Sequence, residues 1–195
     1  MAQQLSFPWF ESETSRRQSL FFALRPPQLA GLCIGQRAEE MRCRSGLSAK
    51  VRPVDRLHVS LHAPSRSLVG PRAMEAALKR AAETTALAMP AFALTLDRAM
   101  SFAGRQWPLV LLPRAGAGEA EIEILYRVLG HALVRAGLGR RLRPRFTPHL
   151  TLLYGERGIE EQPIDPITWL VAEFVLIHSV RGEGHRLLGQ WALHG

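Results

Sequence analysis

The chain has 195 residues, of which 47% are hydrophobic, so its length and composition exclude wholesale disorder and predict one domain with a substantial core. Lys and Arg number 25 against 17 Asp and Glu, giving a net charge of +8, and every basic residue except Lys50 and Lys79 is an arginine. The planar arginine fork suits phosphate, so this composition favours an anionic partner without distinguishing RNA, a nucleotide and a membrane surface.

Several classes of protein are disfavoured by the sequence. No apolar stretch approaches the ~20 residues that span a bilayer, so we expect no membrane segment. Residues 1–17 are rich in Gln, Ser, Glu and Thr, which predicts a flexible tail rather than a signal peptide. We therefore expect a cytoplasmic protein. Residues 18–195 are predicted to form a single two-lobed domain. Cys33 and Cys43 form no C-x-x-C pair and are predicted to be buried free thiols.

Hydrophobic periodicity predicts strands and helices in the order strand, helix, strand, helix, strand, strand, helix, strand, strand, strand. These elements span, in that order, residues 19–24, 28–44, 56–62, 71–89, 91–99, 107–112, 119–136, 146–154, 169–180 and 186–193. In the first helix we expect Leu29, Leu32, Cys33 and Met41 to face inward. The pattern predicts an α+β architecture with largely antiparallel sheets and helices packed outside.

One short motif occurs twice, each time on a predicted strand. It reads histidine, apolar residue, hydroxyl residue, apolar residue; the first copy contains His58 and Ser60, and the second contains His149 and Thr151. Side chains at positions i and i+2 of a strand point to the same face, so each histidine shares a face with its hydroxyl. Two such strands facing each other would place two imidazoles and two hydroxyls around one cavity.

That set of groups suits phosphodiester cleavage at neutral pH. The attacking water must lose a proton and the leaving ribose oxygen must gain one, and two imidazoles with an intrinsic pKa near ~6.5 can do both. Each such proton transfer contributes roughly 10²–10⁴ in rate. The hydroxyls of Ser60 and Thr151 can donate hydrogen bonds to the phosphate oxygens, where negative charge develops.

Arginines accompany both motifs. If the strands are regular, Arg56 and Arg145 lie on the same faces as the motif histidines, and Arg140, Arg141 and Arg143 crowd the approach to the second motif. These residues are candidates for holding the backbone of a polyanion; the alternative for the stretch 140–145 is a solvated loop.

The other histidines are predicted to have no catalytic part. We expect His62 at the surface, and metal binding by His58 with His62 is disfavoured because no carboxylate accompanies them on that strand. The remaining histidines lack any chemical context and are predicted to be structural; they are His131, His178, His185 and His194.

At the two motifs the sequence resembles the 2H phosphoesterase superfamily, and within it the bacterial RNA 2′,3′-cyclic phosphodiesterases, also called 2′-5′ RNA ligases or LigT-like proteins. The resemblance covers about residues 18–194: residues 20–27 look like the family's opening strand, 146–153 like its second motif, and 173–179 with 188–191 like its closing hairpin. It implies a bilobal α+β fold with two pseudo-symmetric, mainly antiparallel sheets, external helices and a central cleft.

The resemblance also implies roles for the motif residues. His58 matches the family's proton donor, His149 its proton acceptor, and Ser60 and Thr151 its phosphate-contacting hydroxyls. Ser60 replaces the commoner threonine and keeps the hydroxyl. After the first motif the family continues with an aromatic residue and a glycine, whereas residues 62–65 here read His-Ala-Pro-Ser, which affects substrate preference rather than chemistry.

The expected function is hydrolysis of RNA 2′,3′-cyclic phosphodiester ends to 2′-phosphomonoesters, with no metal or cofactor. The expected partner is RNA carrying such an end; we expect a monomer with no obligate protein partner. Three alternatives stay open: a phosphodiesterase acting on 2′-5′ oligonucleotides or small cyclic nucleotides, a non-catalytic RNA-binding module with the same fold, and the reverse reaction, 2′-5′ RNA ligation.

Overall fold

The computed structural model describes residues 18–64, 71–114, 116, 118–138, 146–180 and 183–194. The tail expected at residues 1–17 lies outside this described part. The described residues form β1 (Gln18–Leu24), α1 (Gln28–Arg44), a 3₁₀ turn η3 (Val54–Arg56), β2 (Val59–Ser60), α2 (Pro71–Leu87), β3 (Phe92–Ser101), β4 (Trp107–Pro113), α3 (Glu119–Arg135), β5 (Leu150–Gly155), β6 (Gln162–Val171), β7 (Glu173–Val180) and β8 (Gly184–Ala192).

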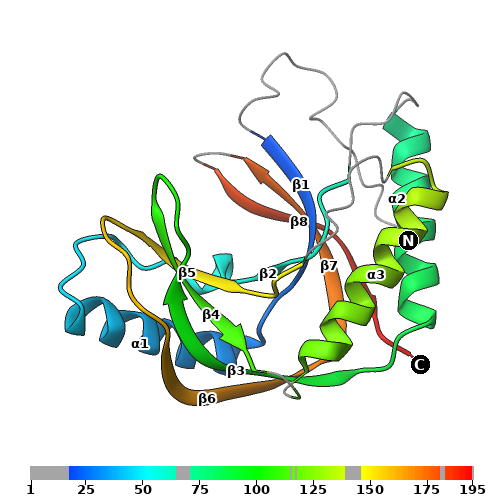
Figure 1. Cartoon of the computed structure of the whole chain (residues 1–195). Coiled ribbons are helices and arrows are strands. Elements are labelled where there is room, and N and C mark those ends of the chain that lie inside the picture. Colours follow the sequence, from blue (N-terminus) through cyan, green and yellow to red (C-terminus); the bar gives the residue numbers. More distant parts are fainter. Residues whose placement is uncertain are drawn as a thin grey trace.

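The strands form one eight-stranded sheet in the order β6-β3-β4-β5-β2-β1-β7-β8, with every neighbouring pair antiparallel (Figure 1). This confirms the α+β class with antiparallel pairing. The two sheets expected from the sequence are the two halves of this single sheet. The halves meet where β2 pairs with β5, through Val59 opposite Leu150.

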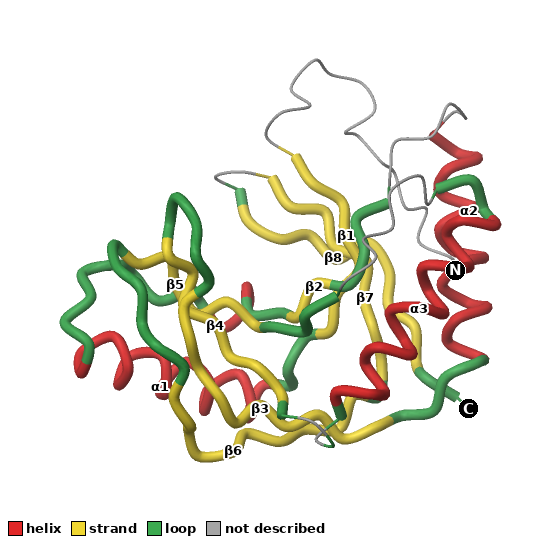
Figure 2. Tube along the Cα trace, in the orientation of Figure 1, coloured by secondary structure: helices red, strands yellow, loops and turns green. Residues whose placement is uncertain are grey.

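The helices form two groups. Helix α1 packs against β5 and β6 of one half, while α2 and α3 pack against each other, with α2 also contacting β8 and α3 contacting β3. Figures 1 and 2 show α1 along one side of the molecule and the α2–α3 pair on the other. The join between β2 and β5 therefore lies near the middle of the fold.

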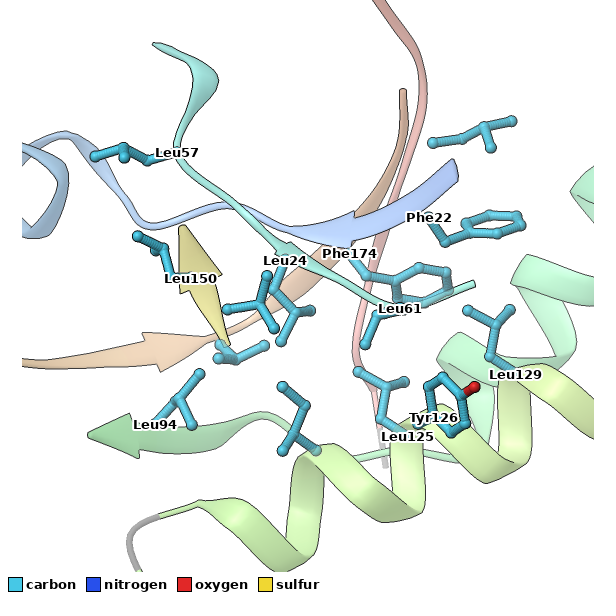
Figure 3. Packing of buried hydrophobic residues seen from close by; sticks show 14 of the residues in the cluster. Phe22, Leu24, Leu57, Leu61, Leu94, Leu125, Tyr126, Leu129, Leu150 and Phe174 are labelled. Atoms are coloured by element: carbon cyan, nitrogen blue, oxygen red, sulfur yellow. The ribbon is translucent and has the colours of Figure 1, made fainter. Parts of the chain in front are cut away.

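One apolar core runs beneath both halves of the sheet and includes residues from strands and helices alike. Figure 3 shows part of it, with Phe22 and Leu24 of β1, Leu150 of β5 and Phe174 of β7 among the residues drawn. Because burying such a side chain stabilises a fold by about 1.5–3 kcal/mol, this core fixes the positions of the strands that carry the motifs.

A small second cluster lies on the other face of β1. It contains Ala23, Val175 and Ile177, with Phe21 packed against it. Side chains alternate between the two faces of a strand, so Phe21 and Ala23 point away from the core that holds Phe22 and Leu24. This second face is the one on which the candidate site is built.

Both motif strands are shorter than the sequence predicts. Residues 56–62 were expected to be one strand, but Arg56 ends the 3₁₀ turn η3 and β2 spans only Val59–Ser60. The second motif strand begins at Leu150 rather than at residue 146. Pro148, two residues earlier, has no backbone N–H to donate to a ladder.

The prediction of one strand over residues 169–180 was wrong. The chain there forms two strands, β6 and β7, separated at Ala172, and β6 begins at Gln162. Sequence patterning missed the first part of β6 because Pro163 and Pro166 disfavour a central strand. Strand β6 lies at the edge of the sheet, where a missing N–H is tolerated.

The inward face of α1 was also predicted wrongly, except at Met41. Leu29 is 78% exposed, Leu32 is exposed, and Cys33 and Cys43 are exposed free thiols rather than buried ones. The buried residues of this helix are mostly small: Ala30, Gly31, Ile34, Ala38 and Met41. A Cβ at Gly31 would lie 2.7 Å from a methyl group of Val54, so close approach to η3 selects this face.

Candidate active site

The two motifs meet at the join between the halves of the sheet. Val59 and Leu150 oppose each other across the antiparallel pair and are 1% and 0% exposed. Continuing this register by one residue on each side places His58 opposite Thr151 and Ser60 opposite His149. Opposed side chains lie on one face of a sheet, so both histidines and both hydroxyls share the face opposite to Val59 and Leu150.

Both imidazoles are held in the same way. Nδ1 of His58 lies 2.8 Å from the carbonyl oxygen of Arg56, and Nδ1 of His149 lies 2.8 Å from the carbonyl oxygen of Thr147. A carbonyl oxygen only accepts, so in each ring Nδ1 carries the proton and donates it. This bond fixes the ring orientation and leaves Nε2 of each neutral imidazole as the nitrogen available to a substrate.

The surroundings of the two rings differ. The His58 ring packs between two others, with centroid distances of 4.9 Å to Phe21 and 5.2 Å to His185. Phe21 and His185 also contact each other, at 5.7 Å. Among the described residues, one ring packs on His149: Phe102, edge-on, at 5.0 Å. The described rings therefore enclose His58 more than they enclose His149.

Enclosure changes the protonation of His58. Burial lowers the pKa of His58 from 6.5 to about 4, against the opposing effect of the Arg56 carbonyl, and the positive charges of His185, Arg52 and His149 lower it further. His58 is therefore neutral at pH 7 in the unliganded site. The effect of His149 also shows that the two histidines lie within electrostatic reach of each other. An anion between them would raise the pKa of His58.

Arg52 is a site residue that the sequence prediction missed. Its backbone N–H donates to the carbonyl of Leu152 at 2.7 Å, and its guanidinium carbon lies 5.8 Å from the centroid of the Tyr154 ring. Its charge lowers the pKa of both His58 and His185. Arg52 lies in an irregular segment between α1 and η3, so no periodic pattern marks it.

Arg56 reaches the same region by a different route from the one predicted. It does not share a strand with His58, because it belongs to η3. Its guanidinium packs against Gly184 at the start of β8. If Gly184 had a Cβ, that atom would lie 3.1 Å from a terminal nitrogen of Arg56, and the φ angle of +103° also favours glycine there. This places Arg56 next to His185. The predicted arginines Arg140, Arg141, Arg143 and Arg145 lie outside the described residues, and their roles stay predictions.

His185 was predicted to be structural, and the structure instead places it against the candidate donor His58. The first residues of β8 carry no sequence motif. The position of His185 near His58 therefore becomes visible only from the pairing of β8 with β7 in the folded sheet. His178 is buried, and burial lowers its pKa. His131 and His194 are exposed.

The expectation that His62 lies at the surface was wrong. His62 is buried, its ring stacks on Tyr126 at a centroid distance of 3.8 Å, and its Nε2 donates to the backbone carbonyl of Tyr126 at 2.7 Å. Tyr126 in turn stacks on Phe146 at 4.1 Å. Through this stack of rings, His62 after β2 and Phe146 before β5 both pack on Tyr126 of α3. The stack therefore helps to hold the two motif segments in place.

Neither a metal-binding cluster nor a membrane-spanning helix is found in the described part of the chain. No group of three or more His, Cys, Asp or Glu is arranged to hold a metal ion within the described ranges. Of the helices that the structure describes, none is long and apolar enough to cross a membrane.

The fold and the paired histidine–hydroxyl motifs define a LigT-like 2H phosphoesterase, and comparison with known proteins agrees. The family model for the 2′-5′ RNA ligase superfamily matches residues 32–183. The chain belongs to this superfamily, which indicates a phosphodiesterase- or ligase-type activity. No curated protein sequence matches the chain.

Solved structures show the same fold. E. coli LigT complexed with 3′-AMP is 26% identical, with a TM-score of 0.69 over 92% of this chain and 99% of that one. The protein TT0787 of Thermus thermophilus is 18% identical, with a TM-score of 0.71 over 91% and 98%. The PDE domain of MHV ns2 is 19% identical, with a TM-score of 0.51 over 80% and 98%, and like TT0787 it supports the fold alone.

Proposed function

We propose that this protein hydrolyses RNA 2′,3′-cyclic phosphodiester ends to 2′-phosphomonoesters, with His58 and His149 as its acid–base pair. The observation that carries the proposal is the repeated anchoring of the two imidazoles. Each donates from Nδ1 to the carbonyl two residues before it, and among the described residues neither Nε2 has a hydrogen-bond partner on the face that the rings share with Ser60 and Thr151. Two free ring nitrogens on one face suit a reaction that needs one proton removed and one delivered.

In the proposed reaction, water attacks the phosphorus of the cyclic phosphate. Nε2 of His149 accepts a proton from the water as the new P–O bond forms. Nε2 of His58 delivers a proton to the 3′ oxygen as the P–O3′ bond breaks, which leaves the phosphate on the 2′ oxygen. Ser60 and Thr151 donate hydrogen bonds to the non-bridging oxygens, where charge develops.

This assignment requires a protonated His58, although the unliganded site favours its neutral form. The bound phosphodiester supplies the missing interaction, because a negative charge beside the imidazole raises its pKa. Substrate binding and protonation of His58 are then coupled. 2′-5′ ligation differs from this scheme in the nucleophile: a 5′ hydroxyl of a second RNA replaces water, gives its proton to His149, and forms the 2′-5′ diester as His58 protonates the departing 3′ oxygen.

The main alternative keeps the chemistry and changes the substrate to a 2′-5′ oligonucleotide or a small cyclic nucleotide. E. coli LigT in complex with 3′-AMP shows a relative that takes a ribonucleotide with a phosphate on the ribose. This supports a ribose phosphate as the group bound at the two histidines here, and it fits either substrate size.

The first test replaces the two histidines. We expect His58→Ala and His149→Ala each to lower kcat for opening an RNA 2′,3′-cyclic phosphate by roughly 10²–10⁴. The double variant should lose less than the product of the single losses, because the residues act as a unit. The exposed His194→Ala is a matched control and should keep full turnover.

Circular dichroism of each variant serves as the folding control, and EDTA in the assay checks that turnover needs no divalent ion. A folded His149→Ala protein with near wild-type turnover contradicts the proposed base. Loss of wild-type activity in EDTA with rescue by a divalent ion contradicts the two-histidine mechanism itself.

A further inference from the structure

A cluster of positive charges surrounds His185 and takes no part in the two-histidine mechanism. Arg56 packs on Gly184, next to His185 in the chain. The charges of Arg52, Arg56 and Arg25 all act on His185, where they add to burial in lowering its pKa, and Asp55 opposes them. The cluster therefore holds three guanidinium groups against one carboxylate.

The arginines of this cluster are not neutralised by the residues that the structure describes. Within those residues no ion pair joins Arg52 or Arg56 to a carboxylate, in contrast to Arg37, which pairs with Glu40 and Asp165. Arg25 donates to the backbone carbonyl of Asp55 at 3.3 Å, so its positive charge is also uncompensated by that contact. Uncompensated arginines beside a half-buried histidine are suited to an anion.

The position of the cluster relative to the motif histidines identifies the anion. In the sheet order β5-β2-β1-β7-β8, His58 lies between His149 at β5 and His185 on β8. The rings of His58 and His185 are in contact, with a centroid distance of 5.2 Å, so the cluster is directly adjacent to the pair His58 and His149. A ligand with one phosphate between His58 and His149 can place a second anionic group against the cluster.

We propose that Arg52, Arg56 and His185 form a subsite for a second phosphate of the substrate, the internucleotide phosphate on the 5′ side of the terminal cyclic phosphate. This inference rests on the proposed function. A 2′,3′-cyclic phosphate closes the 3′ end of an RNA, so every other phosphate of that strand lies on its 5′ side. The subsite makes an RNA end, rather than a cyclic mononucleoside phosphate, the preferred substrate.

Each residue has a distinct task in this subsite. The guanidinium of Arg52 lies beside Tyr154, and that of Arg56 lies against Gly184, so both are positioned before the ligand arrives. Guanidinium groups donate paired hydrogen bonds to phosphate oxygens. His185 can add a donor from its ring, and the arriving phosphate offsets the charges of Arg52 and Arg56 that disfavour its protonation.

Binding of two unreactive ligands tests the subsite without relying on turnover. The probes are adenosine 2′-monophosphate, which has only the phosphate of the proposed product, and adenosine 2′,5′-bisphosphate, which adds a phosphate on the 5′ side. We expect calorimetry to show the bisphosphate binding at least about tenfold more tightly to the wild-type protein, with an advantage that shrinks as salt is raised.

The variants are Arg52→Met, Arg56→Met and His185→Gln, which keep side-chain length or shape and so favour folding. Each should reduce the ratio of the two affinities several-fold. Arg44→Ala removes an exposed arginine at the end of α1 and should leave the ratio unchanged. Circular dichroism checks that each variant is folded. If one variant is unfolded, the comparison uses the other two.

Three outcomes overturn the subsite: equal wild-type affinities for the two ligands, no measurable binding of the bisphosphate, or variants that weaken both ligands by the same factor. The last result would assign the arginines to the phosphate at the catalytic pair. If cyclic phosphates are not hydrolysed but the affinity ratio is high and falls in the variants, the proposed reaction fails and the subsite stands.

Discussion

His58 and His149 are anchored alike but enclosed differently. Both donate from Nδ1 to the carbonyl oxygen two residues earlier in the chain. His58 is held between the rings of Phe21 and His185, whereas Phe102 is the one ring that packs on His149 within the described part of the chain. The same backbone hydrogen bond thus orients two imidazoles that lie in different environments. Different environments allow two chemically identical groups to take opposite roles in proton transfer.

The state of His58 can be checked directly by NMR. We expect the nitrogen signals of His58 to show Nδ1 protonated and Nε2 unprotonated in the free protein at neutral pH. Because burial lowers the pKa of His58 to about 4, its ring should stay neutral until the solution is strongly acidic. Saturating adenosine 2′-monophosphate should raise this pKa, since a phosphate favours the imidazolium. An unchanged pKa of His58 would show that the phosphate does not bind beside its imidazole.

The two motif hydroxyls are predicted to matter less than the histidines. Ser60→Ala and Thr151→Val each remove one hydrogen bond to a charged oxygen, worth about 1.5–3 kcal/mol, so kcat/KM should fall roughly 10- to 150-fold. Thr84→Val, at an exposed position of α2, is the matched control and should have no effect on turnover. A Thr151→Val enzyme with full activity would remove that hydroxyl from the proposed site.

At the scale of elements, the site depends on the contact between two short strands. Strand β2 has two residues, and its register with β5 rests on Val59 opposite Leu150. Neighbouring backbone bonds support it: Leu61 donates to the carbonyl of Phe22 at 2.8 Å, and Phe22 donates to the carbonyl of His62 at 2.7 Å. The buried apolar pair therefore fixes the relative position of the two histidines.

Leu150→Ala should destabilise the protein by about 2–5 kcal/mol, because it opens a cavity at a fully buried position where the halves of the sheet meet. Leu170→Ala makes the same chemical change at a position of β6 that is 62% exposed, and it should alter the free energy of unfolding by less than about 0.5 kcal/mol. Urea unfolding measures both values. Equal effects of the two changes would show that the join contributes no more than a surface position.

At the scale of the whole molecule, several enclosed histidines make stability depend on pH. Burial lowers the pKa of His58, His62, His178 and His185 in the folded state. Above pH 6.5 such an imidazole is neutral in both the folded and the unfolded chain. As the pH falls below 6.5, the unfolded chain binds protons that the folded protein binds poorly, so the free energy of unfolding decreases.

We therefore expect the free energy of unfolding to fall as the pH is lowered from about 6.5 towards 4. The contribution of His58 alone is at most about 3 kcal/mol, from the difference between 6.5 and about 4. Urea unfolding at pH 7.5 and pH 5 measures the loss, and His58→Gln should show a smaller loss than the wild-type protein. Stability that rises on acidification would contradict the direction of these pKa shifts.

The sequence by itself determined the two motifs, the three helices and most of the strands, because apolar periodicity and the spacing of His58 to Ser60 and His149 to Thr151 are local features. It failed at β6, where an edge position tolerates the prolines, and on α1, where the close approach of Gly31 to Val54 selects the buried face.

Only the tertiary structure decided which residues complete the site. Val59 and Leu150 join the halves of the sheet, and His185 reaches His58 through the order of the strands, although the two histidines are separated by more than half of the chain. Arg52 reaches both histidines from an irregular segment. Such contacts depend on how distant segments pack on a shared core, and no local pattern in the sequence encodes that packing.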